Sequence, residues 1–265
     1  FVFDNRGLIL QDARIREASA ENLALIADHT YWWPYGESGL YRPLTTLSYL
    51  FNYAVLGNAT DPWGYHALNF ALHLLNVFLV WLLARRLLTA GAEYVAALWA
   101  VHPVLTESVT NIIGRADLLA GAAILGGLLL YLKSAEATGG RRWVWLAALS
   151  LTATAGAFAK ESAVVVVGVI LLYELCWWRG RARALLLGVA ATIPGIAWML
   201  VQRASVLAAS TSVFFPSSDN PLVTTGFWTA RLTALKLIAH YVVLLFWPVT
   251  LSCDYSYSQI ALFAG

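Results

Sequence analysis

The chain is poor in charged residues. Only 12% of its 265 residues are Asp, Glu, Lys or Arg, whereas a soluble domain carries about 25%. Hydrophobic residues make up 60% of the chain, and the mean hydropathy is +0.66. These values exclude a water-soluble protein and indicate an integral membrane protein.

Several other features are absent or scarce. The chain has only two cysteines, and we expect both to be free thiols rather than part of a disulfide framework. The formal net charge is only +2, and no basic run occurs, so nucleic acid is not an expected partner. The sequence contains no Walker loop, dinucleotide fingerprint, nucleophile elbow, channel filter or evident inverted repeat, which argues against the enzyme and transporter classes that depend on them.

Long apolar segments dominate what is present. They cover residues 66–84, 91–104, 116–132, 142–159, 161–178, 183–202 and 226–247. A membrane-spanning helix needs about 20 residues, and the second segment is short enough to be a partial span. We therefore expect an all-α membrane protein, a polytopic bundle of six to seven membrane segments over residues 65–265. Many of the 12 tryptophans lie at segment ends, as in the aromatic belts of membrane proteins.

Residues 1–64 are more polar and aromatic. We expect this part to be an extracytoplasmic loop with a short helix at Ala20–Ala27. Between Pro43 and Leu56, apolar residues recur near helical spacing, which predicts an amphipathic helix on the membrane surface. The chain begins abruptly at Phe1 with no signal peptide, so we expect a first helix to precede it.

Basic residues in short loops predict the orientation. Three loops are marked as cytoplasmic by Arg85, Arg86, Lys133, Arg141, Arg142, Arg179, Arg181 and Arg183. Residues 1–64, 102–115, 160–161 and 203–225 then face outward. The last segment contains Arg231, Lys236 and His240, so it either lines a cavity or lies partly in the interface. The side of Asp254 is left open.

A block of ionisable residues stands between two apolar segments, Ala90–Val101 and Leu118–Leu132. It contains His102, Glu107, Arg115 and Asp117. Such groups are costly to desolvate at a bilayer boundary, which favours a functional site. The arginine could bind a phosphate through its fork of donors, or it could form a structural ion pair with Glu107 or Asp117. The residues alone do not decide between these interpretations.

Other polar residues also admit two interpretations. Asp4 is either a general base or a solvated loop residue. Lys160 and Glu161 are more simply a charged turn than an anion site. Arg203, Arg231 and Lys236 add positive charge near the outer face, where some of them are expected to be ordinary snorkelling residues. A polar stripe at helical spacing is better explained by hydrogen bonds between helices than by a metal site; it consists of His66, Asn69, His73 and Asn76.

Seven motifs in the same order resemble one known family. They are Phe3-Asp4-Asn5, the segments 41–48 (YRPLTTLS), 64–69 (GYHALN), 102–109 (HPVLTESV) and 114–117 (GRAD), Ala159-Lys160-Glu161, and 254–257 (DYSY). Together they resemble the membrane part of the transmembrane-and-tetratricopeptide-repeat O-mannosyltransferases and their bacterial relatives, within the GT-C glycosyltransferase superfamily. The matches span nearly the whole chain.

This resemblance implies a GT-C type bundle that works on the extracytoplasmic face of a bacterial inner membrane. The donor would be a sugar on a polyprenyl phosphate, and the acceptor a protein hydroxyl or a glycan. Asp4 would be the general base of an inverting transfer. The donor phosphate would be bound by Arg115 and Lys160, with Arg231 and Lys236 as weaker candidates. The site would be shaped by His102, Glu107, Asp117, Arg42 and Asp254. No cofactor is expected, and a divalent metal is left open.

Two departures from the family pattern matter. Asn5 stands where the family usually has a second acid, and the chain ends at Gly265, without the repeats of many relatives. We therefore expect an incomplete chain that lacks a C-terminal region as well as a first helix. An alternative function follows: a non-catalytic GT-C-like structural subunit, bound to membrane lipids and to other membrane subunits. Sugar transfer and a polar cavity reaching Asp4 would distinguish the enzyme from the subunit.

Overall fold

The computed structural model describes residues 4–34, 39–177, 181–210, 220–252 and 259–263. Within these residues the secondary structure is helical, without strands. Four helices of this part are long and apolar enough to cross a membrane: α3 (Pro62–Leu87), α6 (Arg115–Glu136) with the short turn before it, α9 (Ala182–Ala209) and α10 (Phe227–Phe246). The protein is an all-α membrane protein, as predicted. Six to seven membrane segments remain a prediction.

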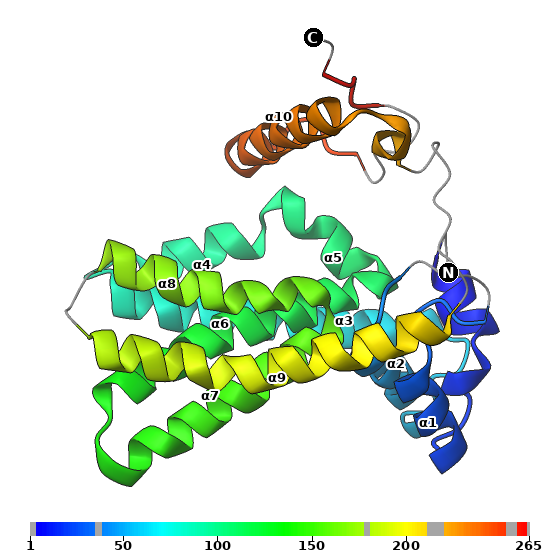
Figure 1. Cartoon of the computed structure of the whole chain (residues 1–265), viewed down its shortest axis with the longest axis horizontal. Coiled ribbons are helices and arrows are strands. Elements are labelled where there is room, and N and C mark those ends of the chain that lie inside the picture. The colour runs from blue at the N-terminus through cyan, green and yellow to red at the C-terminus, as the bar shows by residue number, and fades with distance from the viewer. Residues whose placement is uncertain (1–3, 35–38, 178–180, 211–219, 253–258, 264–265) are drawn as a thin grey trace.

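The bundle consists of helices that lie side by side along the long axis (Figure 1). Helix α6 packs against α3 on one side and against α7 (Gly139–Ala159) on the other, and α7 packs against α9. The core between them is aliphatic, with Leu128, Leu132, Leu149 and Ile170 all buried. Small residues let α6 and α7 approach closely, because a Cβ at Gly156 would lie only 2.4 Å from the Cβ of Ala123.

The N-terminal part covers one end of this bundle (Figure 1). It contains two short turns, Arg6–Gln11 and Ala13–Ile15, then α1 (Ala20–Asp28), α2 (Pro43–Leu50) and a π-helical turn, Phe51–Val55. Helix α1 begins after Ser19, whose hydroxyl accepts the backbone N–H of Asn22. Helices are therefore present in both predicted stretches, whereas a position on the membrane surface stays a prediction for the second. This segment shares a buried core with Tyr65 of α3 and with Ile112, so it packs on the bundle end rather than standing apart.

Two predicted apolar segments are broken into short pieces. Segment 91–104 forms α4 (Ala92–Ala100) and then the turn Pro103–Leu105; it is followed by α5 (Thr106–Thr110) and the turn Ile112–Gly114. Pro103 lacks the N–H that a continuing helix needs, which explains the break. Segment 161–178 forms the turn Glu161–Val165 and α8 (Val166–Cys176). Neither α4 nor α8 reaches the length of a span on its own.

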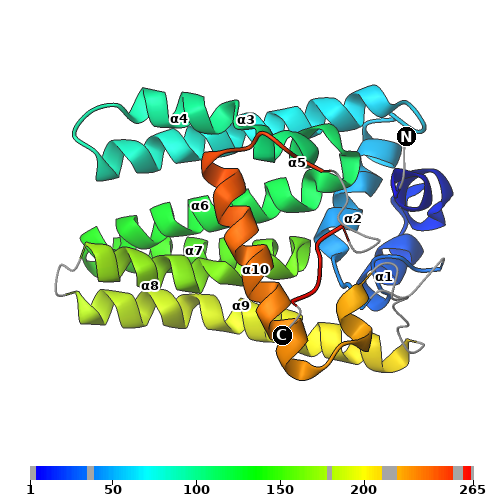
Figure 2. The same ribbon diagram turned by 90° about the horizontal axis from the view of Figure 1, so that it is seen from above.

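The chain alternates between the two ends of the bundle. The starts of α3 and α6 and the ends of α7 and α9 lie beside the N-terminal part, whereas their other termini lie at the far end (Figures 1 and 2). Helix α10 runs across the direction of α6, α7 and α8 on one side of the bundle (Figure 2). For the residues that the structure describes, the predicted division of the basic and polar loops into two sets therefore corresponds to the two ends of the bundle.

Candidate active site

Arg115 is the most enclosed charged residue of the polar block. It begins α6 and has 0% of its surface exposed. Its Nε donates to the Asn69 side-chain oxygen at 2.8 Å, and its Nη1 donates to the Asn52 oxygen at 2.6 Å and to the Ser48 backbone carbonyl at 3.0 Å. Nη2 donates to the Tyr65 carbonyl at 3.0 Å. The guanidinium therefore joins α2, the following π-helical turn, α3 and α6, and it has no surface to offer a ligand.

Lys160 is the more accessible cation of this end. It caps the C-terminus of α7, and its side chain is 23% exposed. The ammonium forms an ion pair with Asp117, whose side chain is 47% exposed and lies in the first turn of α6. The ion pair joins two motifs that lie far apart in the sequence. A pair this exposed is weakly bound, so an anion can compete with the carboxylate for Lys160.

A second ion pair stands beside the first. Arg42 Nε lies 3.0 Å from a carboxylate oxygen of Glu161, and the backbone N–H of Tyr41 donates to the other oxygen at 3.3 Å. The hydroxyl of Thr45 donates to the carbonyl of Ala159 at 2.7 Å. These contacts fix the start of α2 on the corner between α7 and the next turn. The fold thus places Arg42, Asp117, Lys160 and Glu161 in one polar cluster, the outer cluster.

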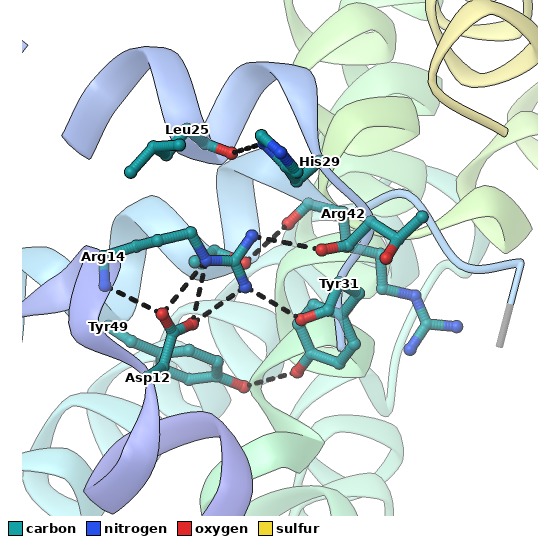
Figure 3. Close-up of polar contacts among 9 residues, drawn as sticks. Asp12, Arg14, Leu25, His29, Tyr31, Arg42 and Tyr49 are labelled. Carbon is teal, nitrogen blue, oxygen red and sulfur yellow. Dashed lines mark hydrogen bonds and ion pairs between the residues drawn. The ribbon is translucent and has the colours of Figure 1, made fainter. Parts of the chain in front are cut away.

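A tyrosine pair lies behind this cluster. The hydroxyls of Tyr31 and Tyr49 are 3.1 Å apart, and both side chains are buried (Figure 3). The Arg42 guanidinium lies over the Tyr31 ring, and that of Arg115 lies over the Tyr49 ring. Burial raises the pKa of Tyr31 well above its ordinary value, and the pKa of Tyr49 is raised for the same reason. Both hydroxyls therefore stay protonated at neutral pH and can donate hydrogen bonds.

The Tyr31 segment is itself held by a buried ion pair. Arg14 donates through Nη2 to an Asp12 carboxylate oxygen at 2.8 Å, and both side chains are almost fully buried. The same guanidinium donates to the carbonyls of Thr30 and Tyr31, each at 3.1 Å (Figure 3). The charge is thus neutralised locally and its donors are satisfied. Because Arg14 and Asp12 are occupied in this way, we interpret the pair as structural.

Asp4 lies next to a residue that is fixed to the base of α6. Asn5 is buried, and its side-chain oxygen accepts the backbone N–H of Ile113 at 3.2 Å. Ile113 belongs to the turn that leads directly into Arg115. Asp4 is exposed, and as the neighbour of Asn5 it belongs to the N-terminal part that covers this end of the bundle. Asn5, at the position of the second family acid, has a packing role here.

Three further predicted site residues, His102, Arg231 and Lys236, have contacts on or near α10. His102 Nε2 lies 3.1 Å from the Leu245 carbonyl of α10, and Glu107 is exposed on α5. On α10, Arg231 lies over the Phe227 ring, while Lys236 donates to the Ala261 carbonyl at 3.0 Å. The contacts of His102, Arg231 and Lys236 thus run to α10 and the segment after it rather than to Lys160. Asp254 lies outside the described residues.

The polar stripe of α3 bonds to neighbouring helices. Asn69 donates to the Asn111 carbonyl at 3.0 Å, His73 Nε2 lies 3.0 Å from the Ala100 carbonyl, and Asn76 donates to the Leu118 carbonyl at 2.9 Å. The preference for interhelical hydrogen bonds is therefore confirmed for these three residues, whereas His66 is exposed. In the described part of the chain, no three His, Cys, Asp or Glu residues gather as a metal site would require.

Sequence reasoning did not single out the tyrosine pair or Asn52. Nothing in the local pattern marks the two tyrosines, because their hydroxyls meet only when the segment after α1 packs on α2. One signal was available for Asn52: it lies in residues 49–56 (YLFNYAVL), which are otherwise apolar or aromatic. A lone amide in such a stretch usually has a buried partner.

Comparisons with known proteins agree with the sequence motifs. The family described as Protein O-mannosyl-transferase TMTC, DUF1736, matches residues 209–264. The chain is 32% identical to Protein O-mannosyl-transferase Tmtc2 of Drosophila melanogaster, over 96% of the chain and 28% of that protein. It is 32% identical to Tmtc1 of the same species (98% and 32%) and 28% identical to TMTC3 of Homo sapiens (99% and 31%).

The three relatives match nearly the whole chain, but the chain matches only part of each relative. The chain spans about a third of the length of the curated relatives it matches. The three relatives are animal proteins, so they do not test the predicted bacterial location. No solved structure matches the chain significantly. The likeness to named proteins therefore rests on sequence.

Proposed function

Because the chain is a relative of the TMTC protein O-mannosyl-transferases, we propose that it carries the membrane-embedded site of a mannosyl transfer to protein hydroxyls. The donor is a sugar on a polyprenyl phosphate, and the fold is of GT-C type. The observation that carries the proposal is the outer cluster. Three separate motif segments bring two partly exposed cations, Arg42 and Lys160, to the end of the bundle where Asp4 lies.

Lys160 is the donor-phosphate residue of this proposal. A phosphodiester carries one negative charge at neutral pH, as does the Asp117 carboxylate that Lys160 now contacts. The donor phosphate replaces that carboxylate at the ammonium, and Arg42 adds a second positive charge next to it. Partial burial strengthens both interactions relative to bulk water. Arg115 does not bind the phosphate, because it is buried and its donors are engaged within the protein.

Asp4 acts as the general base. Its carboxylate takes the proton of the acceptor hydroxyl while the hydroxyl oxygen attacks the anomeric carbon of the sugar. The bond between that carbon and the phosphate oxygen breaks, and polyprenyl phosphate leaves with the bonding electrons. Because attack and departure occur on opposite faces, the anomeric centre is inverted. The reaction proceeds on the extracytoplasmic side, opposite the end that carries most of the basic loop residues.

Two substitutions test this proposal through different kinetic constants. We expect Lys160→Gln to raise the KM for a mannosyl polyprenyl phosphate by about 10-fold or more, since a charged hydrogen bond to the phosphate is lost. We expect Asp4→Asn to lower kcat by about 100-fold or more with unchanged donor binding, as for a lost general base. Transfer of radiolabelled mannose to an acceptor peptide measures both. Lys133→Gln is the matched control, because it removes a lysine in the last turn of α6, at the opposite end of the bundle.

The possible results separate the roles. Full transfer by Asp4→Asn removes Asp4 from the role of base, and an unchanged KM in Lys160→Gln removes Lys160 from the donor site. If the unmodified chain neither binds the donor nor transfers sugar, the non-catalytic subunit becomes the better explanation.

A further inference from the structure

The far end of the bundle carries a concentration of positive charge that the proposed reaction does not use. Helix α3 has Arg85 and Arg86 in its last turn, α6 has Lys133 in its last turn, and α7 begins with Arg141 and Arg142 in its first turn. We call these five residues the basic corner. The carboxylates with contacts there are Glu136 and Glu93. The corner thus has five cations against two carboxylates in a chain whose net charge is only +2.

Contacts between the three helix ends hold these cations together. Arg86 Nη2 lies 2.8 Å from a Glu136 carboxylate oxygen, which ties α3 to α6. Arg142 Nε donates to the Ala137 carbonyl at 3.0 Å, which ties the start of α7 to the end of α6. The basic corner is therefore a surface of defined shape rather than a set of independent loop residues.

Tryptophans accompany the cations. The Arg85 guanidinium lies 4.7 Å from the centre of the Trp81 ring, and the Lys133 ammonium lies 4.6 Å from that of Trp145. Tryptophan favours the headgroup level of a bilayer, so these pairs place the cations near lipid phosphates. Next to Arg142, Trp143 is 61% exposed and Val144 is 64% exposed. A ligand that covers this surface must offer both an anion and an apolar part.

We propose that the basic corner binds anionic phospholipid, with the lipid phosphate at Arg85, Lys133 and Arg141 and the acyl chains along Trp143 and Val144. A soluble phosphate fits the cations but leaves the adjoining apolar side chains uncovered. The position of the corner supports a lipid, since α3 and α6 are candidate membrane spans and both end there. Anionic headgroups attract basic residues just outside a span. The proposal does not depend on the sugar-transfer reaction.

The test uses the full chain purified in a neutral detergent. Its thermal unfolding is followed while phosphatidylglycerol, phosphatidylcholine or glycerol 3-phosphate is titrated. We expect phosphatidylglycerol alone to raise the unfolding temperature at low ligand concentration. The variant Arg85→Gln/Lys133→Gln is expected to need about 10-fold or more phosphatidylglycerol for the same shift. Arg86 and Arg142 are left in place because they tie the helix ends together.

The matched control is Arg6→Gln/Lys236→Gln, which also removes one arginine and one lysine, both exposed and outside the basic corner. It should respond to phosphatidylglycerol like the unmodified chain. The proposal is overturned if the corner variant responds normally, or if the control loses the response to the same extent. It is also overturned if glycerol 3-phosphate or phosphatidylcholine gives the same shift as phosphatidylglycerol at equal concentration.

Discussion

At the residue scale, the structure distinguishes Arg115 from Lys160 as candidates for binding a phosphate. Both are basic residues in family-like motifs, and the family resemblance makes both of them candidates for binding a phosphate. Burial separates them, because Arg115 is enclosed by three neighbouring segments whereas Lys160 stays partly exposed. Sequence predicts that charge accumulates at this end of the bundle. It cannot predict which charge faces a ligand, since that depends on packing between residues 40 to 70 positions apart.

The structural role of Arg115 predicts a stability effect. Arg115→Lys keeps the charge but loses the planar fork that reaches Asn52, Asn69 and Tyr65 at once. We expect it to lower the free energy of unfolding by about 3 kcal/mol or more, because several buried acceptors lose their donors. Thermal unfolding in detergent measures this. Arg203→Lys, outside this network, should change stability much less. A fully stable Arg115→Lys with weakened donor binding would restore Arg115 as a phosphate residue.

The buried tyrosine pair predicts a loss of stability in alkali. In the unfolded chain a tyrosine releases its proton near pH 10, while burial raises the pKa of folded Tyr31 and Tyr49. Their contribution is therefore fully present below about pH 10 and is lost as the pH rises above it, by about 1.4 kcal/mol per pH unit for each tyrosine. Thermal unfolding between about pH 8 and 11 checks this.

A variant isolates one of the two tyrosines. Tyr31→Phe should be less stable at neutral pH, because Tyr49 loses its hydroxyl partner, but its stability should fall less steeply in alkali. Equal slopes for this variant and the unmodified chain would contradict the assignment.

At the element scale, the α5–α6 connection explains why a glycine opens the motif of residues 114–117. A Cβ at Gly114 would lie 2.5 Å from the backbone oxygen of Ser108 and 2.6 Å from its Cα. Backbone atoms cannot move aside as a flexible side chain can. Any other residue would therefore push apart the turn that places Arg115 and Asp117 at the start of α6. Sequence indicates a boundary at this point, but only the structure identifies the close backbone approach.

This close approach predicts a difference between two glycines. Gly114→Ala should cost about 2 kcal/mol or more of unfolding free energy, through overpacking against Ser108. Gly140→Ala is the control, because a Cβ there meets nothing within 4 Å and alanine favours the helix by about 0.5–1 kcal/mol. Thermal unfolding of both variants measures the contrast. Equal stability would show that the turn can relax without cost.

The interrupted segments show that hydropathy locates an apolar stretch but does not predict where the helices within it end. Hydropathy finds the apolar stretches 91–104 and 161–178, yet it does not reveal that each is divided into short helices. A proline is visible at position 103, and it marks one of these breaks in advance. The other division lies after the turn Glu161–Val165, whose start is held by the ion pairs of Lys160 and Glu161 with Asp117 and Arg42. Those contacts have no local signature.

At the scale of the whole molecule, one end of the bundle carries paired charges and the other end carries an excess of cations. The end that carries the N-terminal part contains paired cations and carboxylates, such as Arg42 with Glu161 and Lys160 with Asp117. The far end contains the basic corner. Sequence predicts this separation well, because it needs only the alternation of helices and the position of basic loops. The ion pairs themselves depend on packing and were not predicted.

The separation predicts an orientation that single cysteines can test. In a Cys176→Ser/Cys253→Ser background, Glu17→Cys places a thiol on the N-terminal part and Arg141→Cys places one at the basic corner; both positions are exposed. The positive-inside rule puts the basic corner in the cytoplasm. In intact cells, a membrane-impermeant maleimide should label Glu17→Cys but not Arg141→Cys, and permeabilised cells should allow labelling of both. The reverse pattern would place Asp4 and Lys160 in the cytoplasm, and the proposed extracytoplasmic reaction would then be wrong.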